Sequence, residues 1–190
     1  MNSAVSARKR DRLTPAEFTL LGMISLAPED GHIHGYDLNR RMTEGAIGAI
    51  IRLESGMLYH YLKKLTQRGL ITSTTEHQEG RPTRHLHALT ETGRATLGAW
   101  LDTPVQATRE MRLEFLLKLW FARHTGREEA NILIRSQRAV IQSLIDSLEQ
   151  QLRETPDATA DDRFMRTVIG LRLAQNRAVA SWLDELEAAP

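Results

Sequence analysis

The stretch SGMLYHYLKKLTQRGLI, from Ser55 to Ile71, decides how this chain is expected to fold. Leucines recur in it at steps of four and three residues, at Leu58, Leu62 and Leu65, which predicts a helix with one buried side. Ser55 is a suitable residue for the N-terminal cap, and Gly69 suits the position just past the helix end. The stretch therefore predicts a short amphipathic helix that ends abruptly at Gly69.

Two more helices are predicted before it. Thr14 to Glu17 reads Thr-Pro-Ala-Glu, which has the residue types of a capping box with proline at the first helical position. Pro28 to Gly31 interrupts the apolar run that follows. Gly35 to Glu44 then has the apolar spacing of a second, short helix.

The hydrophobic period changes after the third helix. Leu70 to His77 and Arg84 to Leu89 are predicted strands, and the turn Glu79 to Thr83 between them carries Arg81 beside Pro82. A fourth helix follows Thr90. This order predicts a winged helix-turn-helix domain over residues 13–101, mostly α-helical with a small two-stranded β-wing.

A winged helix of this kind places its third helix in the major groove of DNA. The leucines leave Met57, His60, Tyr61, Lys63, Lys64 and Arg68 for the outer side of that helix. Lysines opposite leucines are also ordinary on a solvated helix, and arginines can merely solubilise a turn. Arg81 and Arg84 at the wing could reach phosphates, and the two features together, in this order, favour DNA binding.

The second half is predicted to be helical throughout. Helices are expected over residues 110–123, 128–154 and 163–188, after a hinge-like linker at 102–108 that contains Pro104. Their apolar stripes are long, so pairing with a second copy of the chain is the expected way to bury them, although the arm could instead fold back on its own winged helix. Residues 102–190 are thus an expected antiparallel helical dimerisation and effector arm, with candidate interface residues Ile134, Ile141, Leu144, Leu148, Leu152, Val168, Leu171, Val179, Trp182 and Leu186.

Composition excludes several other classes of protein. The chain has no cysteine, so disulfides and thiolate zinc sites are excluded. The tail at residues 1–12 is polar and basic, unlike a secretory signal, and it could contact DNA or be disordered. No apolar run reaches the roughly 20 residues that cross a bilayer, so a cytoplasmic protein is expected.

Several motifs resemble those of the PadR-type winged-helix regulators. They include Leu20-Leu21-Gly22, His34-Gly35-Tyr36-Asp37-Leu38, Ser55-Gly56-Met57-Leu58-Tyr59, Leu62-Lys63-Lys64-Leu65, Arg68-Gly69-Leu70-Ile71, Gly80-Arg81-Pro82, Leu89-Thr90-Glu91 and Gly93-Arg94. Glu114 to Leu119 and Trp182 to Leu186 resemble the C-terminal helical (Vir-type) region of the larger members. The chain departs from the family pattern at Met57, Leu86 and His87, where threonine and tyrosines are common.

The resemblance implies a transcriptional repressor that binds a near-palindromic DNA operator as a homodimer and often responds to a small molecule. It implies that Tyr59 and Lys63 contact DNA and that the wing around Arg81 contacts the backbone. The complete set of candidate DNA-binding residues is Ser55, Met57, Tyr59, His60, Lys63, Lys64, Arg68, Arg81, Thr83 and Arg84.

Other functions are less well supported. The histidine pairs His32/His34 and His85/His87 are too few for a specific metal site, and we expect no metal, cofactor or catalysis. An apolar or aromatic effector could bind among Trp100, Phe115, Trp120 and Trp182, although core packing is the commoner role of such residues. A winged helix that only contacts proteins, and an activator on the same fold, are the alternatives.

Overall fold

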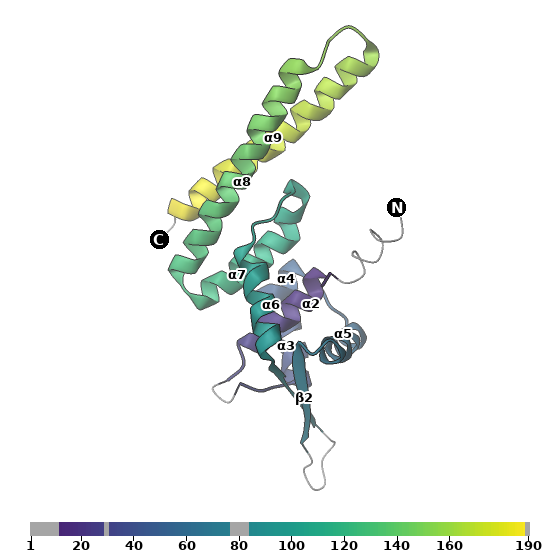
Figure 1. Ribbon diagram of the computed structural model, residues 1–190, viewed down its shortest axis with the longest axis vertical. Coiled ribbons are helices and arrows are strands. Elements are labelled where there is room, and N and C mark those ends of the chain that lie inside the picture. Colours follow the sequence, from purple (N-terminus) through teal and green to yellow (C-terminus); the bar gives the residue numbers. More distant parts are fainter. Residues whose placement is uncertain (1–11, 29–30, 77–83, 189–190) are drawn as a thin grey trace. The chain divides into compact units, whose positions relative to one another are not determined.

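The computed structural model describes residues 12–28, 31–76 and 84–188, and its contacts divide the chain into two units, residues 1–102 and 103–190. The first unit holds α2 (Pro15–Ser25), β1 (Ile33–His34), α3 (Gly35–Glu44), α4 (Ala46–Ile50), α5 (Ser55–Gln67), β2 (Ile71–Glu76), β3 (Arg84–Leu89) and α6 (Glu91–Asp102). This is the winged-helix order, so the predicted fold class is confirmed (Figure 1).

The helix signals in the first unit act as predicted. Thr14 and Glu17 form the capping box of α2, with the Thr14 amide donating to Glu17 Oε2 at 2.8 Å. The core between the helices contains Leu20, Leu38, Leu58 and Leu65, each with no exposed surface. Residues on one side of α2, α3 and α5 therefore hold the three helices together.

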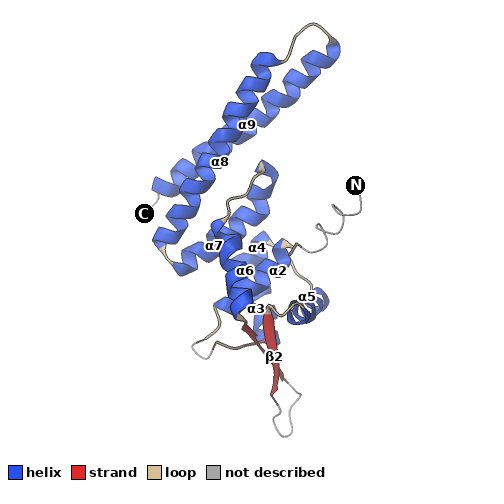
Figure 2. Ribbon diagram, in the orientation of Figure 1, coloured by secondary structure: helices blue, strands red, loops and turns tan. Residues whose placement is uncertain are grey.

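The sheet is larger than the predicted two-stranded wing. β3 pairs antiparallel with β2 on one side and with β1 on the other, giving three strands in the order β1-β3-β2 (Figure 2). β1 has two residues, Ile33 and His34, which is too short to produce an alternating pattern in the sequence. It ties the start of α3 to the wing.

One local prediction around α5 needs correction. Between α3 and α5, the five-residue helix α4 forms with Ile47 buried, and no element was predicted there. Ser55 does not cap α5. The capping position is Glu54, and the Ser55 hydroxyl donates to Asn39 Oδ1 of α3 at 3.0 Å. Gly69, in contrast, has the left-handed φ of +67° that its assignment required.

The second unit is helical among its described residues. It contains a 3₁₀ turn (Thr108–Glu110), a π-helical turn (Met111–Phe115), α7 (Leu116–Thr125), α8 (Arg127–Glu154) and α9 (Ala160–Ala188). α8 and α9 pack against each other as a long hairpin (Figures 1 and 2). No helix among the described residues has both the length and the apolar character needed to cross a membrane.

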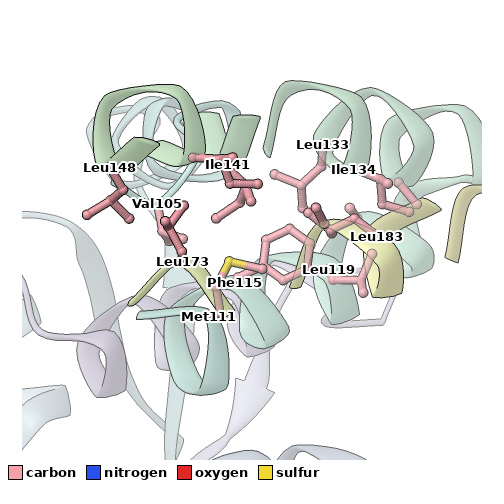
Figure 3. Close-up of a cluster of buried hydrophobic side chains, with 14 of the residues drawn as sticks. Val105, Met111, Phe115, Leu119, Leu133, Ile134, Ile141, Leu148, Leu173 and Leu183 are labelled. Atoms are coloured by element: carbon pink, nitrogen blue, oxygen red, sulfur yellow. The ribbon is translucent and has the colours of Figure 1, made fainter. Parts of the chain in front are cut away.

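Much of the apolar stripe on these helices is buried within one chain. Ile134, Ile141 and Leu148 have 8% of their surface exposed or less, and they pack with Phe115, Leu173 and Leu183 (Figure 3). The premise that this arm cannot bury its stripes alone is therefore wrong for these residues. Leu144, Leu152, Val179, Trp182 and Leu186 are partly buried against the same cluster, whereas Leu171 is 61% exposed.

The expected hinge-like linker is anchored along most of its length. Val105 donates its amide to Gln137 Oε1 (2.8 Å) and accepts from Gln137 Nε2 (2.9 Å), and Gln137 is fully buried. Lys118 Nζ donates to the Thr103 carbonyl, and Thr108 Oγ1 donates to Asn176 Oδ1 at 2.8 Å. Residues 103–108 are thus held by side chains from α7, α8 and α9, and the hinge prediction is wrong for them.

Candidate nucleic-acid interface

α5 presents two different surfaces. Leu58, Leu62 and Leu65 are buried in the first unit. On the opposite side Met57 is 43% exposed and Tyr59 53% exposed, and His60 and Lys63 are exposed as well. A helix fixed by one apolar stripe, with polar and aromatic side chains projecting from the other, has the arrangement that reads a DNA groove.

Tyr59 crosses the start of α3. A Cβ atom added at Gly35 would lie 3.2 Å from Cε1 of Tyr59 and 3.8 Å from its hydroxyl oxygen. The ring therefore rests on the glycine, where a side chain would crowd it. About half of the surface of Tyr59 stays exposed. Gly35, the first residue of α3, is thus in contact with the ring of Tyr59 from α5.

The prediction that Lys64 lies on the outer side of α5 is wrong. Its Nζ lies 2.8 Å from Oε1 of Glu17, a carboxylate on α2 with no exposed surface. Burial by itself would raise the pKa of Glu17, but hydrogen bonds from Lys64 and Thr14 together bring that pKa below its usual value. Lys64 therefore points towards α2 and neutralises a buried charge.

Arg68 ends the helix. It occupies the C-cap position, and its amide donates to the Lys64 carbonyl at 3.0 Å. Its side chain is half-buried. A cation here complements the partial negative charge of the helix end as well as any nearby phosphate.

The wing is described only in its strands. Glu76 pairs with Arg84 at the last described step of the β2–β3 ladder. Arg81 and Thr83 lie outside the described residues, and so does the side chain of Arg84. Their proposed contacts with DNA stay predictions.

His87 of β3 is a second buried polar group near α5, beside Gly35. It is 5% exposed, its Nδ1 has no hydrogen-bond partner among the described residues, and its Nε2 would lie 3.7 Å from a Cβ at Gly35. Burial, followed by the charges of His85 and His34, lowers the pKa of His87 to about 4. Nothing in the sequence separated this histidine from exposed His85.

The four aromatic residues considered for an effector site lie in different surroundings. Trp100 belongs to the first unit, where it stacks on Phe18 with ring centroids 4.6 Å apart. Phe115 and Trp182 meet edge to face at 5.9 Å in the second unit. Trp120 contacts Phe121 and His124. Among the described residues, no three His, Asp or Glu side chains gather in a way that could hold a metal ion.

Comparison with known proteins gives two family matches along the chain. Residues 23–99 match the Transcriptional regulator PadR-like family, and residues 111–189 match the Virulence activator alpha C-term family. The first match contains β1 to β3 and the whole of α5, and the second contains the whole of α7, α8 and α9.

Individual relatives agree with these matches. The negative transcriptional regulator PadR of Bacillus subtilis is 25% identical over 178 residues, which is 90% of this chain and 95% of that protein. Its crystal structure with operator DNA aligns with 94% of this chain and 99% of that one at 24% identity, with a TM-score of 0.46. Its structure with p-coumaric acid aligns with 92% and 98% at a TM-score of 0.42 and the same identity.

Proposed function

Because the chain belongs to the PadR-like family of DNA-binding transcriptional regulators, which are not enzymes, we propose that it is a repressor that binds a near-palindromic operator as a homodimer and responds to a small effector. The observation that carries the DNA-binding part is the exposed side of α5, where Tyr59, His60 and Lys63 project away from the core. Such a protein works where the chromosome is, so we propose a cytoplasmic location.

Repression is proposed from the relative. The Bacillus subtilis protein is a negative regulator and is related to this chain over nearly its whole length. The same relative has been solved with operator DNA and with p-coumaric acid, which indicates the two classes of partner to test first. An aromatic or apolar acid is therefore the first class of effector to add to a DNA-binding assay.

Residues 13–101 are proposed to bind DNA, and residues 102–190 to dimerise and to receive the effector. Within the second unit, the contact between Phe115 and Trp182 is the proposed place for an aromatic effector to act. Trp100 is left out of this proposal because it belongs to the first unit, where its ring is stacked on Phe18.

For the interface with DNA we propose Ser55, Met57, Tyr59, His60, Lys63 and Arg68 of the α5 segment, together with Arg81, Thr83 and Arg84 of the wing. Base contacts would come from the exposed side of α5, and phosphate contacts from Lys63 and the wing arginines. Lys64 is removed from this set because it is paired with Glu17.

The experiment is a fluorescence anisotropy titration of the purified protein against its own upstream DNA and a scrambled control, at two salt concentrations. We expect preferential, salt-sensitive binding to the upstream DNA, because phosphate contacts release counterions. Equal weak binding to both DNAs, or none, would contradict a sequence-specific regulator and would favour a winged helix that contacts proteins.

A further inference from the structure

Two neighbouring lysines of α5 have opposite environments. Lys63 is exposed, whereas Lys64 is half-buried and directed at α2. Successive residues of a helix are about 100° apart around its axis, so two adjacent lysines cannot both face one partner. The two ammonium groups therefore have different surroundings, with that of Lys63 in solvent and that of Lys64 beside Glu17.

Glu17 is built into the start of α2. Its Oε2 accepts hydrogen bonds from the Thr14 amide at 2.8 Å and from the Thr14 hydroxyl at 2.9 Å. Its Oε1 is left for Lys64, at 2.8 Å. A carboxylate with no exposed surface needs such a partner, since an unpaired buried charge is strongly unfavourable.

This geometry fixes one turn of α5 on α2. The leucines that flank Lys64 along the helix, Leu62 and Leu65, are buried in the same core and set which side of α5 faces inward. The ion pair adds an electrostatic contact between one residue of each helix, which the apolar surface alone does not provide.

We infer that Glu17 is a positioning residue for DNA recognition, which holds α5 in place through Lys64 and keeps the Lys64 charge away from DNA phosphates. The inference rests on the proposed DNA-binding function and adds different roles for the two lysines: Lys63 contacts phosphate, and Lys64 pairs with Glu17. Phosphate contacts carry no sequence information. Keeping Lys64 away from the phosphates therefore lowers the affinity of the interface for DNA of any sequence.

The test measures salt dependence of DNA binding for Lys63→Met, Lys64→Met, Glu17→Gln and the double variant Glu17→Gln/Lys64→Met, on upstream and scrambled DNA. Methionine keeps the length of the lysine chain without its charge. Losing one phosphate contact reduces the slope of log affinity against log salt by about one. We expect this reduction for Lys63→Met and an unchanged slope for Lys64→Met.

Glu17→Gln separates positioning from simple stability. Glutamine keeps the size of the side chain and an acceptor for Thr14, but it releases Lys64. We expect the slope to steepen by about one as the freed ammonium reaches phosphate, and the ratio of upstream to scrambled affinity to fall. A residue that only stabilised the fold would change neither the slope nor this ratio.

Thermal unfolding completes the experiment. Lys64→Met should lower the melting temperature by roughly 4–8 °C, and the double variant should recover most of it because no buried charge is left unpaired. If Lys64→Met does not fold, the double variant is used in its place to measure the slope of log affinity against log salt. That slope should equal the slope of the wild type. A slope reduced by about one in either of them, or an unchanged slope in Glu17→Gln, would overturn the inference. A wild-type protein that binds neither DNA would instead overturn the proposed function, and this inference with it.

Discussion

His87 lies on β3 with its ring in the interior of the first unit, next to the glycine that supports Tyr59. Burial keeps the ring neutral, and its pKa of about 4 lies below the value of about 6.5 for an exposed histidine. Between these two values the unfolded chain binds a proton that the folded chain excludes. The resulting stability is fully present above pH 6.5 and is lost as the pH falls towards 4.

This linkage gives a measurable prediction. The free energy of unfolding should fall by about 1–2 kcal/mol more between pH 7 and pH 5 in the wild type than in His87→Leu. Urea denaturation at the two pH values measures it, and His85→Gln is the matched control because His85 is the exposed histidine two residues away. Equal losses in wild type and His87→Leu would show that His87 is not a buried neutral group.

The conformation of a single residue could be predicted from the sequence where it depends on residues close to it in the chain. The capping box of Thr14 and Glu17 and the left-handed Gly69 depend on three or four adjacent positions, and both were predicted. Lys64 was misplaced because its partner is 47 positions earlier and on another helix. The leucine stripe of α5 shows which residues face the core but not which flanking cation meets a buried carboxylate.

At the scale of elements, the start of α6 lies against the backbone of Leu70, the residue just before β2, in one close approach. A Cβ atom at Gly93 would lie 2.0 Å from the Leu70 carbonyl oxygen, far inside contact distance. Thr90 reinforces the junction, since its hydroxyl donates to the Gly69 carbonyl at 2.8 Å and accepts from the Gly93 amide at 3.0 Å. The start of α6 is therefore in close contact with the backbone of the α5–β2 connection.

We predict that Gly93→Ala destabilises the protein, by roughly 1–3 kcal/mol for an overpacked contact, because backbone atoms of β2 or α6 must move. Gly98→Ala is the control on the same helix. Nothing lies within 4 Å of a Cβ there, so alanine should be neutral or stabilising by up to about 1 kcal/mol. Denaturation of both variants measures the difference, and equal stabilities would contradict the close approach.

The elements that sequence reasoning missed share a physical cause. α4 and β1 have five and two residues, too few for a hydrophobic period to appear. The anchoring of residues 103–108 depends on Gln137 and Asn176, polar residues that look like surface positions until the helices around them are known. Long periodic segments such as α8 were predicted within one residue at their start.

At the scale of the whole molecule, the second unit leaves one apolar stripe uncovered. Phe164 is 70% exposed and Leu171 61% exposed, and half-buried Val168 lies between them at helical spacing on α9. The opposite side of α9 is buried against the rest of the unit through Ile169, Leu173 and Leu183. Val168 and Leu171 belong to the sequence-predicted dimer surface, and Phe164 extends it by one turn of α9.

We predict that Leu171→Glu weakens the proposed homodimer while the chain still folds, because the residue is exposed in the single chain. Ser181→Glu is the control, since Ser181 is exposed on the same helix but lies about 100° around its axis from the stripe. Sedimentation equilibrium of the variants measures the effect. A dimer unchanged by Leu171→Glu would place the interface on another surface.

The central claim is that two copies of the winged helix read one operator. Hydroxyl-radical footprinting on the upstream DNA tests it most directly. A two-fold dimer with one α5 in each half-site predicts two protected regions whose centres lie about one helical turn, or roughly 34 Å, apart or a multiple of that spacing. A single protected region, or uniform weak protection along the fragment, would contradict the account.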